Sequence, residues 1–145
     1  MIGLLQRVSS ANVIVEETII GKIDQGLLIL LGIEREDNER NASRLIERIL
    51  TYRVFADNEG KMNLSLTDIQ GGLLLVPQFT LAADTKKGTR PGFSTAASPQ
   101  LAEELFYYCV TEAKHKHGNV SQGKFGADMQ VNLSNDGPVT FWLQV

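Results

Sequence analysis

The rest of the chain is interpreted around one stretch, Leu73-Leu74-Leu75-Val76-Pro77-Gln78-Phe79-Thr80-Leu81. Its four-residue apolar run follows Gly71-Gly72 and is too short for a helix, so the pattern predicts a buried strand. If the strand continues beyond Pro77, Gln78 and Thr80 lie on the same face. Polar side chains at the end of a buried strand are typical of a binding or catalytic site. They also fit a strand end that frays into a loop, where Thr80 satisfies a turn.

Length and composition are those of an ordinary globular protein. The 145 residues, 43% of them hydrophobic and 21% charged, suffice for one domain over residues 1–145 with its own core. No apolar run approaches the roughly 20 residues that cross a bilayer. The N-terminal residues lack the pattern of a secretory signal, and the single cysteine suits a reducing compartment. We therefore expect a cytoplasmic protein with no membrane partner.

The charge distribution limits the kind of nucleic-acid contact. A net charge of −3 argues against binding along a phosphate backbone, which needs a basic surplus. Recognition of one nucleic-acid end through a local patch stays open. The only compact basic patch is the loop of residues 82–94, with Lys86, Lys87 and Arg90. This loop is either solvated or a phosphate contact.

The N-terminal part has the pattern of three strands within residues 2–33. Ile2–Val8 roughly alternates, short apolar segments flank Glu16-Glu17, and Leu27–Leu31 is continuously apolar. A turn is expected at Asp24-Gln25-Gly26. The continuous run predicts a strand that is buried on both faces and therefore central in its sheet.

Two main helices are predicted. The first is capped by Asp37 or Asn38, and its apolar residues recur at helical spacing: Ala42, Leu45, Ile46, Ile49 and Leu50. The second begins at Ser98-Pro99 and stops at Gly118. Together with the strands, they predict a mixed α/β fold, a three-layer β/β/α domain with mostly antiparallel or mixed sheets.

Further strands are predicted on both sides of the central stretch. Tyr52–Phe55 reads as a short strand that precedes a turn at 57–60, whereas residues 61–70 have no clear pattern. From Met129 to Leu133 the chain alternates as a strand, and Val139–Leu143 forms the last one. Because Asn135–Pro138 has the composition of a tight connection, we expect these two strands to form a hairpin.

No standard catalytic set is present in the sequence. A Gly-x-Ser-x-Gly elbow, a phosphate loop, a dinucleotide fingerprint and a Cys-x-x-Cys pair are all missing. His115 and His117 fall on different faces of the second helix, and Cys109 has apolar neighbours. We therefore expect no metal and no cofactor, and a buried rather than nucleophilic cysteine.

Two segments resemble the D-aminoacyl-tRNA deacylase family. Pro77–Leu81 resembles the Ser-Gln-Phe-Thr motif of that family, and Asn135–Thr140 matches a second motif in which the Gly-Pro peptide is cis. The likeness runs over essentially the whole chain. This chain departs from the family at Pro77, where serine is usual. The proline removes a hydroxyl and a backbone N–H beside the site.

The resemblance implies hydrolysis of the ester between a D-amino acid and the 3′ ribose of tRNA, without a cofactor. It makes Gln78, Phe79 and Thr80 the catalytic segment, with backbone N–H groups near Phe79 and Thr80 as oxyanion donors. Thr80 is either a nucleophile or an orienting group. We favour orientation, because the sequence offers no base to activate the hydroxyl; the 2′-hydroxyl of the substrate would then help to activate water.

The same resemblance assigns the substrate-binding residues. Gly137 and Pro138 would enter the site of the partner subunit in a homodimer and hold the α-ammonium group, so that the L-isomer is rejected and glycyl-tRNA becomes a secondary substrate. Phe125, Gly126 and Met129 would form the pocket for the terminal adenine. By composition alone, Phe125 and Met129 would be core residues.

Two rival functions stay open. The first is a homodimer that binds tRNA ends or amino acids without catalysis, because Pro77 has cost the activity. The second is a general esterase with no preference for handedness. Release of amino acid from neither D- nor L-tyrosyl-tRNA would favour the first rival, and release from both would favour the second.

Overall fold

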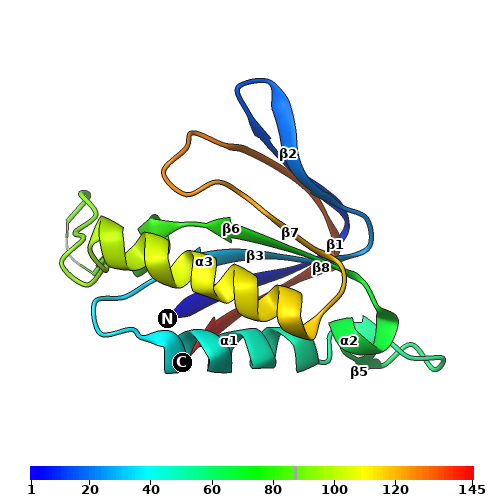
Figure 1. Cartoon of the computed structure of the whole chain (residues 1–145). Helices are drawn as coiled ribbons and strands as arrows, with labels where there is room; N and C mark the ends of the chain where they lie inside the picture. The colour runs from blue at the N-terminus through cyan, green and yellow to red at the C-terminus, as the bar shows by residue number, and fades with distance from the viewer. Residues whose placement is uncertain (87) are drawn as a thin grey trace.

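The centre of the sheet is a parallel pair of strands, β3 (Gly26–Gly32) and β6 (Gly72–Pro77), in a computed structural model that describes residues 1–86 and 88–145 (Figure 1). Apolar side chains of β3 are buried on both faces, and Leu27, Leu28 and Ile29 are each 0% exposed. The predicted central position of this segment is confirmed.

One six-stranded sheet surrounds this pair within the described residues. Its order is β2-β1-β3-β6-β7, and β8 pairs with the other edge of β1. The remaining bounds are Ile2–Val15 (β1), Thr18–Ile23 (β2), Val120–Gln122 (β7) and Gln130–Gln144 (β8). The Ser121 hydroxyl donates to the Lys22 carbonyl at 3.0 Å. Because these residues belong to β7 and β2, the two ends of the sheet meet and the sheet is curled.

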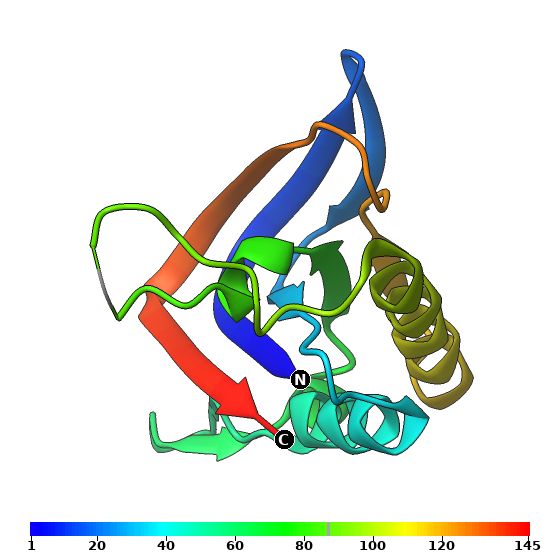
Figure 2. The same cartoon turned by 90° about the vertical axis from the view of Figure 1, so that its left-hand side faces the viewer.

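Two long helices cover one face of the sheet (Figures 1 and 2). Helix α1 (Glu39–Thr51) begins after Asn38, whose side chain accepts from two backbone N–H groups, and it buries the five apolar residues predicted from spacing. Helix α3 (Pro99–Lys116) begins after the capping side chain of Ser98. Shorter elements are α2 (Leu66–Ile69) and the hairpin of β4 (Phe55–Ala56) and β5 (Met62–Leu64).

Two separate hydrophobic clusters produce the layered arrangement. The larger one lies between the helices and one face of β3 and β6, and it includes Leu27 and Ile29 of β3 as well as Phe106 of α3. The smaller one fills the opposite face of the same strands and contains Leu28 of β3, with Val13 from the far half of β1. The β/β/α fold predicted from the sequence is confirmed.

The parallel pair begins with a close backbone approach at Gly26 and Gly72. These two residues face each other at the start of the register, and a Cβ on Gly26 would overlap the Gly72 carbonyl. Only glycine fits such an approach. From this point the register runs without a shift to Leu31 opposite Pro77. The glycines therefore fix where the carboxyl ends of both strands lie.

The strand predicted through Leu81 is wrong beyond Pro77. β6 ends there, and a one-turn 3-10 helix, η1 (Phe79–Ala82), follows. The Gln78 N–H still donates to Leu31 at 2.7 Å, but the Leu81 N–H turns back to the Gln78 carbonyl at 3.2 Å. Extended pairing stops because the partner strand β3 itself ends at Gly32.

The predicted C-terminal hairpin is also wrong. Residues 130–144 form one strand, β8, which pairs with β1 along nearly its whole length. Thr140 faces Gln6 and Asn135 faces Val8, so residues 136–139 form a bulge opposite the single residue Arg7. The turn-like composition of this segment reflects the bulge, and the long partner strand lies at the other end of the sequence.

Two smaller points complete the comparison with the sequence. The short strand predicted at Tyr52–Phe55 lies instead at Phe55–Ala56, whereas the turn after it is present. Among the described residues, no helix combines the length and apolar character that a membrane crossing requires.

Candidate active site

A pocket of about 470 Å³ lies at the carboxyl end of β6. It brings together five of the residues that the sequence singles out, although they come from two segments far apart in the sequence: Gln78, Phe79, Phe125, Gly126 and Met129. Pro77 and the first turns of α3, through Pro99 and Ala102, complete its wall. The strand end and the 125–129 segment therefore belong to one site.

Gln78 and Thr80 are joined by a short hydrogen bond. The Gln78 amide Nε2 donates to Thr80 Oγ1 at 2.6 Å. An amide N–H cannot take up a proton from the hydroxyl, so this contact fixes the position of the Thr80 side chain without offering it a base. The two side chains come together through the turn of η1, not through the shared strand face expected from the sequence.

The backbone N–H groups of Phe79 and Thr80 have no hydrogen-bond acceptor among residues 1–86 and 88–145. They precede the first hydrogen bond of η1, where backbone donors have no partner within the helix. Both residues are exposed, and Phe79 is 59% accessible. Two neighbouring donors beside an open pocket can stabilise an oxyanion.

Phe125 and Met129 combine the two roles expected from the sequence, because each is part of the core and part of a pocket wall. Phe125 is half-buried, and its ring lies 6.3 Å from the Phe106 ring of α3. Met129 is half-buried against the smaller cluster, and its sulfur accepts from the Lys124 N–H at 3.4 Å. Each side chain packs on the core with one side and lines the pocket with the other. The surface is apolar and adaptable, as a nucleobase requires.

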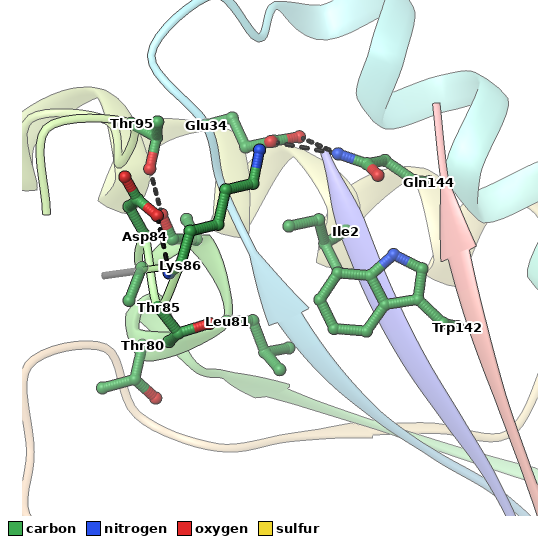
Figure 3. Close-up of a pocket in the computed structure, with 12 residues that line it drawn as sticks. Ile2, Glu34, Thr80, Leu81, Asp84, Thr85, Lys86, Thr95, Trp142 and Gln144 are labelled. Atoms are coloured by element: carbon green, nitrogen blue, oxygen red, sulfur yellow. Dashed lines mark hydrogen bonds between the residues drawn. The ribbon is translucent and has the colours of Figure 1, made fainter. Parts of the chain in front are cut away.

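A second hollow, of about 610 Å³, lies between η1 and the end of β8. Figure 3 shows Thr80 and Leu81 on one side of it and Trp142 and Ile2 on the other. Trp142 is 51% exposed. An exposed tryptophan beside a hollow is typical of a surface that binds a partner or a ligand.

Glu34 closes one end of this second hollow. Its carboxylate accepts from the Met1 ammonium at 2.8 Å and from the Gln144 amide at 3.0 Å (Figure 3). Burial raises the pKa of Glu34, but the hydrogen bonds from Met1 and Gln144 and the charge of the ammonium lower it, and the net pKa lies below its ordinary value. The carboxylate therefore stays ionised and connects the loop after β3 to β8.

Gly137 and Pro138 lie elsewhere, on the exposed bulge of β8. The peptide between them is cis, as the resemblance implied. Gly137 has φ +139, and a Cβ there would come within 2.7 Å of Val139 Cγ2, so the position requires glycine. In a single chain neither residue lines the pocket at the end of β6.

Arg7 holds the bulge in place. Its guanidinium donates to the Asp136 carbonyl at 2.9 Å and to the Val54 carbonyl at 2.6 Å, and it lies 3.6 Å from the Asp136 carboxylate. The side chain is only 15% exposed. No role for Arg7 was predicted from the sequence. Arg7 is a lone cation in an apolar strand, but its partners, Asp136 and Val54, could not be read from the sequence.

Comparison with known proteins decides the family. The family model described as D-Tyr-tRNA(Tyr) deacylase matches residues 4–144. The chain belongs to this deacylase family. A relative from Pseudomonas fluorescens strain Pf-5, named D-aminoacyl-tRNA deacylase, is 64% identical over 144 residues, which are 99% of either chain. A relative of the same name from Pseudomonas putida is 60% identical over 145 residues, or 100% of both chains.

Solved structures agree with the deacylase assignment at the level of the fold. A structure named c-Myc DNA Unwinding Element Binding Protein superposes with a TM-score of 0.96 at 37% identity, and the match covers 100% of this chain and 99% of that one. A probable eukaryotic D-amino acid tRNA deacylase has a TM-score of 0.87 at 14% identity, with 99% and 98% covered. The layered fold described above is therefore the deacylase fold.

Cys109 and His117 lie apart from the pocket at the end of β6. Cys109 is buried in α3, and burial raises the pKa of its thiol to about 12, so it is a buried apolar residue, as predicted. The His117 ring lies 2.6 Å from the Gly71 carbonyl, away from the pocket. Lys86 lines the second hollow and Arg90 is exposed, whereas Lys87 lies outside the described residues. Within those residues, no cluster of three potential metal ligands is found.

Proposed function

We propose that this chain hydrolyses the ester bond of D-aminoacyl-tRNA and releases a free D-amino acid and tRNA. The observation that carries the proposal is the single pocket that joins Gln78 and Phe79 to the 125–129 segment. Membership of the deacylase family over residues 4–144 supports it. The relatives named D-aminoacyl-tRNA deacylase are 64% and 60% identical to it.

The pocket suits an ester at the end of a nucleotide. In this proposal the terminal adenine lies against Phe125, Gly126 and Met129, whose surface is apolar and open on one side. The ester carbonyl then lies near the N–H groups of Phe79 and Thr80, which have no acceptor in the described chain. These donors stabilise the negative charge that develops on the carbonyl oxygen.

Beyond these two donors, the proposed reaction uses few groups of the protein. A water oxygen attacks the ester carbon, the negative charge passes to the carbonyl oxygen, and the ribose oxygen leaves with a proton. The 2′-hydroxyl of the ribose helps to activate the water. Thr80 orients the reactants, because its hydroxyl is held by a hydrogen-bond donor, Gln78 Nε2.

Selection for the D-isomer is assigned to a second copy of the chain. In a symmetric dimer, each copy would offer Gly137-Pro138 to the pocket of the other, since a two-fold interface uses the same surface twice. The exposure of this bulge and of Thr80 supports the arrangement. Carbonyl oxygens of the bulge would hold the α-ammonium group, and an L side chain would clash. Glycine has no side chain, so glycyl-tRNA would be a secondary substrate.

The cell compartment follows from the substrate. We place the activity in the cytoplasm, where tRNA is charged and where a single buried cysteine stays reduced.

Matched D- and L-tyrosyl-tRNA test the proposal. The purified chain is incubated with each substrate, and release of tyrosine is followed over time. We expect release from D-tyrosyl-tRNA only. Release from neither substrate would favour a binding homodimer that Pro77 has inactivated, and equal release from both would favour a general esterase. Sedimentation of the same sample tests the homodimer.

A further inference from the structure

A third hollow, of about 600 Å³, lies directly beside the proposed adenine pocket. The two share Phe79, Ala97 and Pro99 in their walls, so they are adjacent. The third hollow adds Phe93 and Arg35, which the adenine pocket lacks. No substrate group has been placed in the third hollow so far.

An exposed aromatic pair forms one wall of the third hollow. The rings of Phe79 and Phe93 are 5.2 Å apart at an angle of 44°, and they are 59% and 42% exposed. Large aromatic side chains usually bury most of their surface. Two neighbouring rings left open at a tilted angle offer a platform on which a flat base can stack.

A cation without a partner stands at the edge of this platform. Arg35 is exposed, and its guanidinium makes no hydrogen bond or ion pair with any described residue. Neither of its acidic neighbours, Glu34 and Glu36, lines the third hollow. An arginine beside an aromatic surface matches a nucleotide, which has a phosphate next to a base.

The third hollow is held by the backbone. Arg35 N–H donates to the Thr95 carbonyl and Ala97 N–H to the Ile33 carbonyl, both at 3.0 Å. These bonds tie the segment that carries Phe93 to the end of β3. The chamber is therefore formed before any ligand binds, and binding costs little ordering of the chain.

We propose that the third hollow binds the penultimate nucleotide of the tRNA acceptor end, with its cytosine on the Phe79–Phe93 platform and a phosphate at Arg35. The inference rests on the proposed function, because the terminal adenosine must occupy the neighbouring pocket. Consecutive bases of a single strand reach neighbouring chambers, and stacking on aromatic rings tolerates the small cytosine. The enzyme thereby reads two nucleotides and not one.

Substrates of graded length test this proposal. The native chain is given D-tyrosine esterified to adenosine, to the dinucleotide CpA, and to a dinucleotide whose first residue is abasic. We expect kcat/KM to rise by about five- to a hundredfold from adenosine to CpA, the range for one stacked base. The abasic dinucleotide should lose most of this gain and keep only the contribution of its phosphate.

Variants locate the gain in the third hollow. Phe93→Ala should reduce the ratio of kcat/KM for CpA over adenosine towards one, and Phe93→Trp, which can still stack, should retain it. Arg35→Gln should reduce the ratio less, and should remove part of its dependence on salt. Tyr107→Ala is the matched control, since Tyr107 is an exposed aromatic residue that lines neither chamber. Melting temperatures of all variants show whether each one is folded.

Three results would overturn the proposal. The first is equal turnover of the adenosine and CpA esters by the native chain. The second is a folded Phe93→Ala variant that keeps the full CpA gain. The third is a Phe93→Ala variant whose loss of turnover depends on the size of the D-amino acid, because that result would assign the hollow to the amino-acid side chain. Failure of the proposed function is distinct, because then the native chain would cleave none of the three esters.

Discussion

The pocket at the end of β6 and the Gly137-Pro138 bulge differ in how much of their surroundings one chain supplies. The pocket has walls from β6, η1, α3 and the 125–129 segment. The bulge is exposed on β8, and its main support is the guanidinium of Arg7. Figure 2 shows β8, coloured orange to red, on the side of the sheet opposite α3, with its C-terminal end beside α1.

From this difference we expect the two regions to have separate roles in the reaction. A preformed pocket can bind a nucleotide and polarise an ester within a single chain. In the proposed dimer, the bulge meets the amino acid that the other copy holds. Nucleotide binding and catalysis should therefore respond to changes in the pocket, whereas the choice between D- and L-isomers should respond to changes at the bulge.

The largest effect is expected from Gly137→Ala. The new Cβ would lie 2.7 Å from Val139 Cγ2 and 3.1 Å from Arg7 Nη2, at a φ that side chains rarely adopt. The bulge must then move by about an ångström, and a displacement of this size can cost about a hundredfold in rate. We expect kcat/KM for D-tyrosyl-tRNA to fall by that factor and the D-to-L ratio to fall with it. Gly118→Ala, where a Cβ meets no atom, serves as the control.

A smaller effect at the same place is expected from Arg7→Ala. The change removes the donors to Asp136 and Val54 but leaves the bulge its own sequence. We expect a loss of about ten- to a hundredfold in kcat/KM. Arg7→Lys should restore little, because an ammonium cannot span both carbonyls as a guanidinium does. Full activity of the lysine variant would show that charge alone supports the bulge.

Beside the pocket, where Thr80 lines the second hollow, Thr80→Ala should cost about tenfold, the value of one hydrogen bond to a polar partner. The variant loses the group that Gln78 orients but keeps both backbone donors. Single-turnover measurements with D-tyrosyl-tRNA separate this loss from changes in binding. Complete inactivation, with an acylated native enzyme trapped in parallel, would instead make Thr80 the nucleophile.

Pro77→Ser tests whether the departure from the family motif matters. Pro77 is at the last paired position of β6 and lines the pocket. Serine should leave kcat/KM within about twofold, and the greater freedom of its unfolded chain should lower the free energy of unfolding by about 0.4–1 kcal/mol. A large gain in turnover would mean that proline has impaired this chain.

The smallest effect concerns Glu34, which lies outside both regions and joins the N-terminus to the end of β8. Because the pKa of Glu34 is lowered in the folded state, the unfolded chain takes up its proton at a higher pH. Its stabilising contribution is present above the ordinary value of 4.5 and is lost as the pH falls through the folded pKa. Chemical denaturation between pH 6 and pH 3, a range of about three units around that value, should show a shallower loss for Glu34→Gln than for the native chain. Glu47→Gln, on the exposed face of α1, should follow the native curve.

Local patterns in the sequence predicted the parts of the fold that local forces decide. Asn38 and the spacing from Ala42 to Leu50 define α1 because capping and burial both act within a few residues. The apolar run of β3 placed it centrally for the same reason. The composition of residues 135–138 was read as a hairpin because a bulge and a turn use the same residue types. Only the pairing with β1 distinguishes them.

The site was predicted in part. Motif resemblance singled out Gln78–Thr80 and the 125–129 segment, but it could not show that Gln78 and Phe79 line one pocket with that segment, since that depends on α3 and on the end of β3. The turn after Pro77 was missed because it begins where the partner strand β3 ends, at Gly32, and that end could not be read from residues 73–81. Arg7 was missed because its partners, Val54 and Asp136, are far away in the sequence.

The paired glycines at the start of β3 and β6 fix where β6 ends and therefore where the candidate active site lies. They place Gly72 against Gly26, and the five residues of β6 that follow carry the chain to Pro77. Adding or deleting one residue within that interval would turn every later side chain to the opposite face. Insertions and deletions should therefore be excluded from β6.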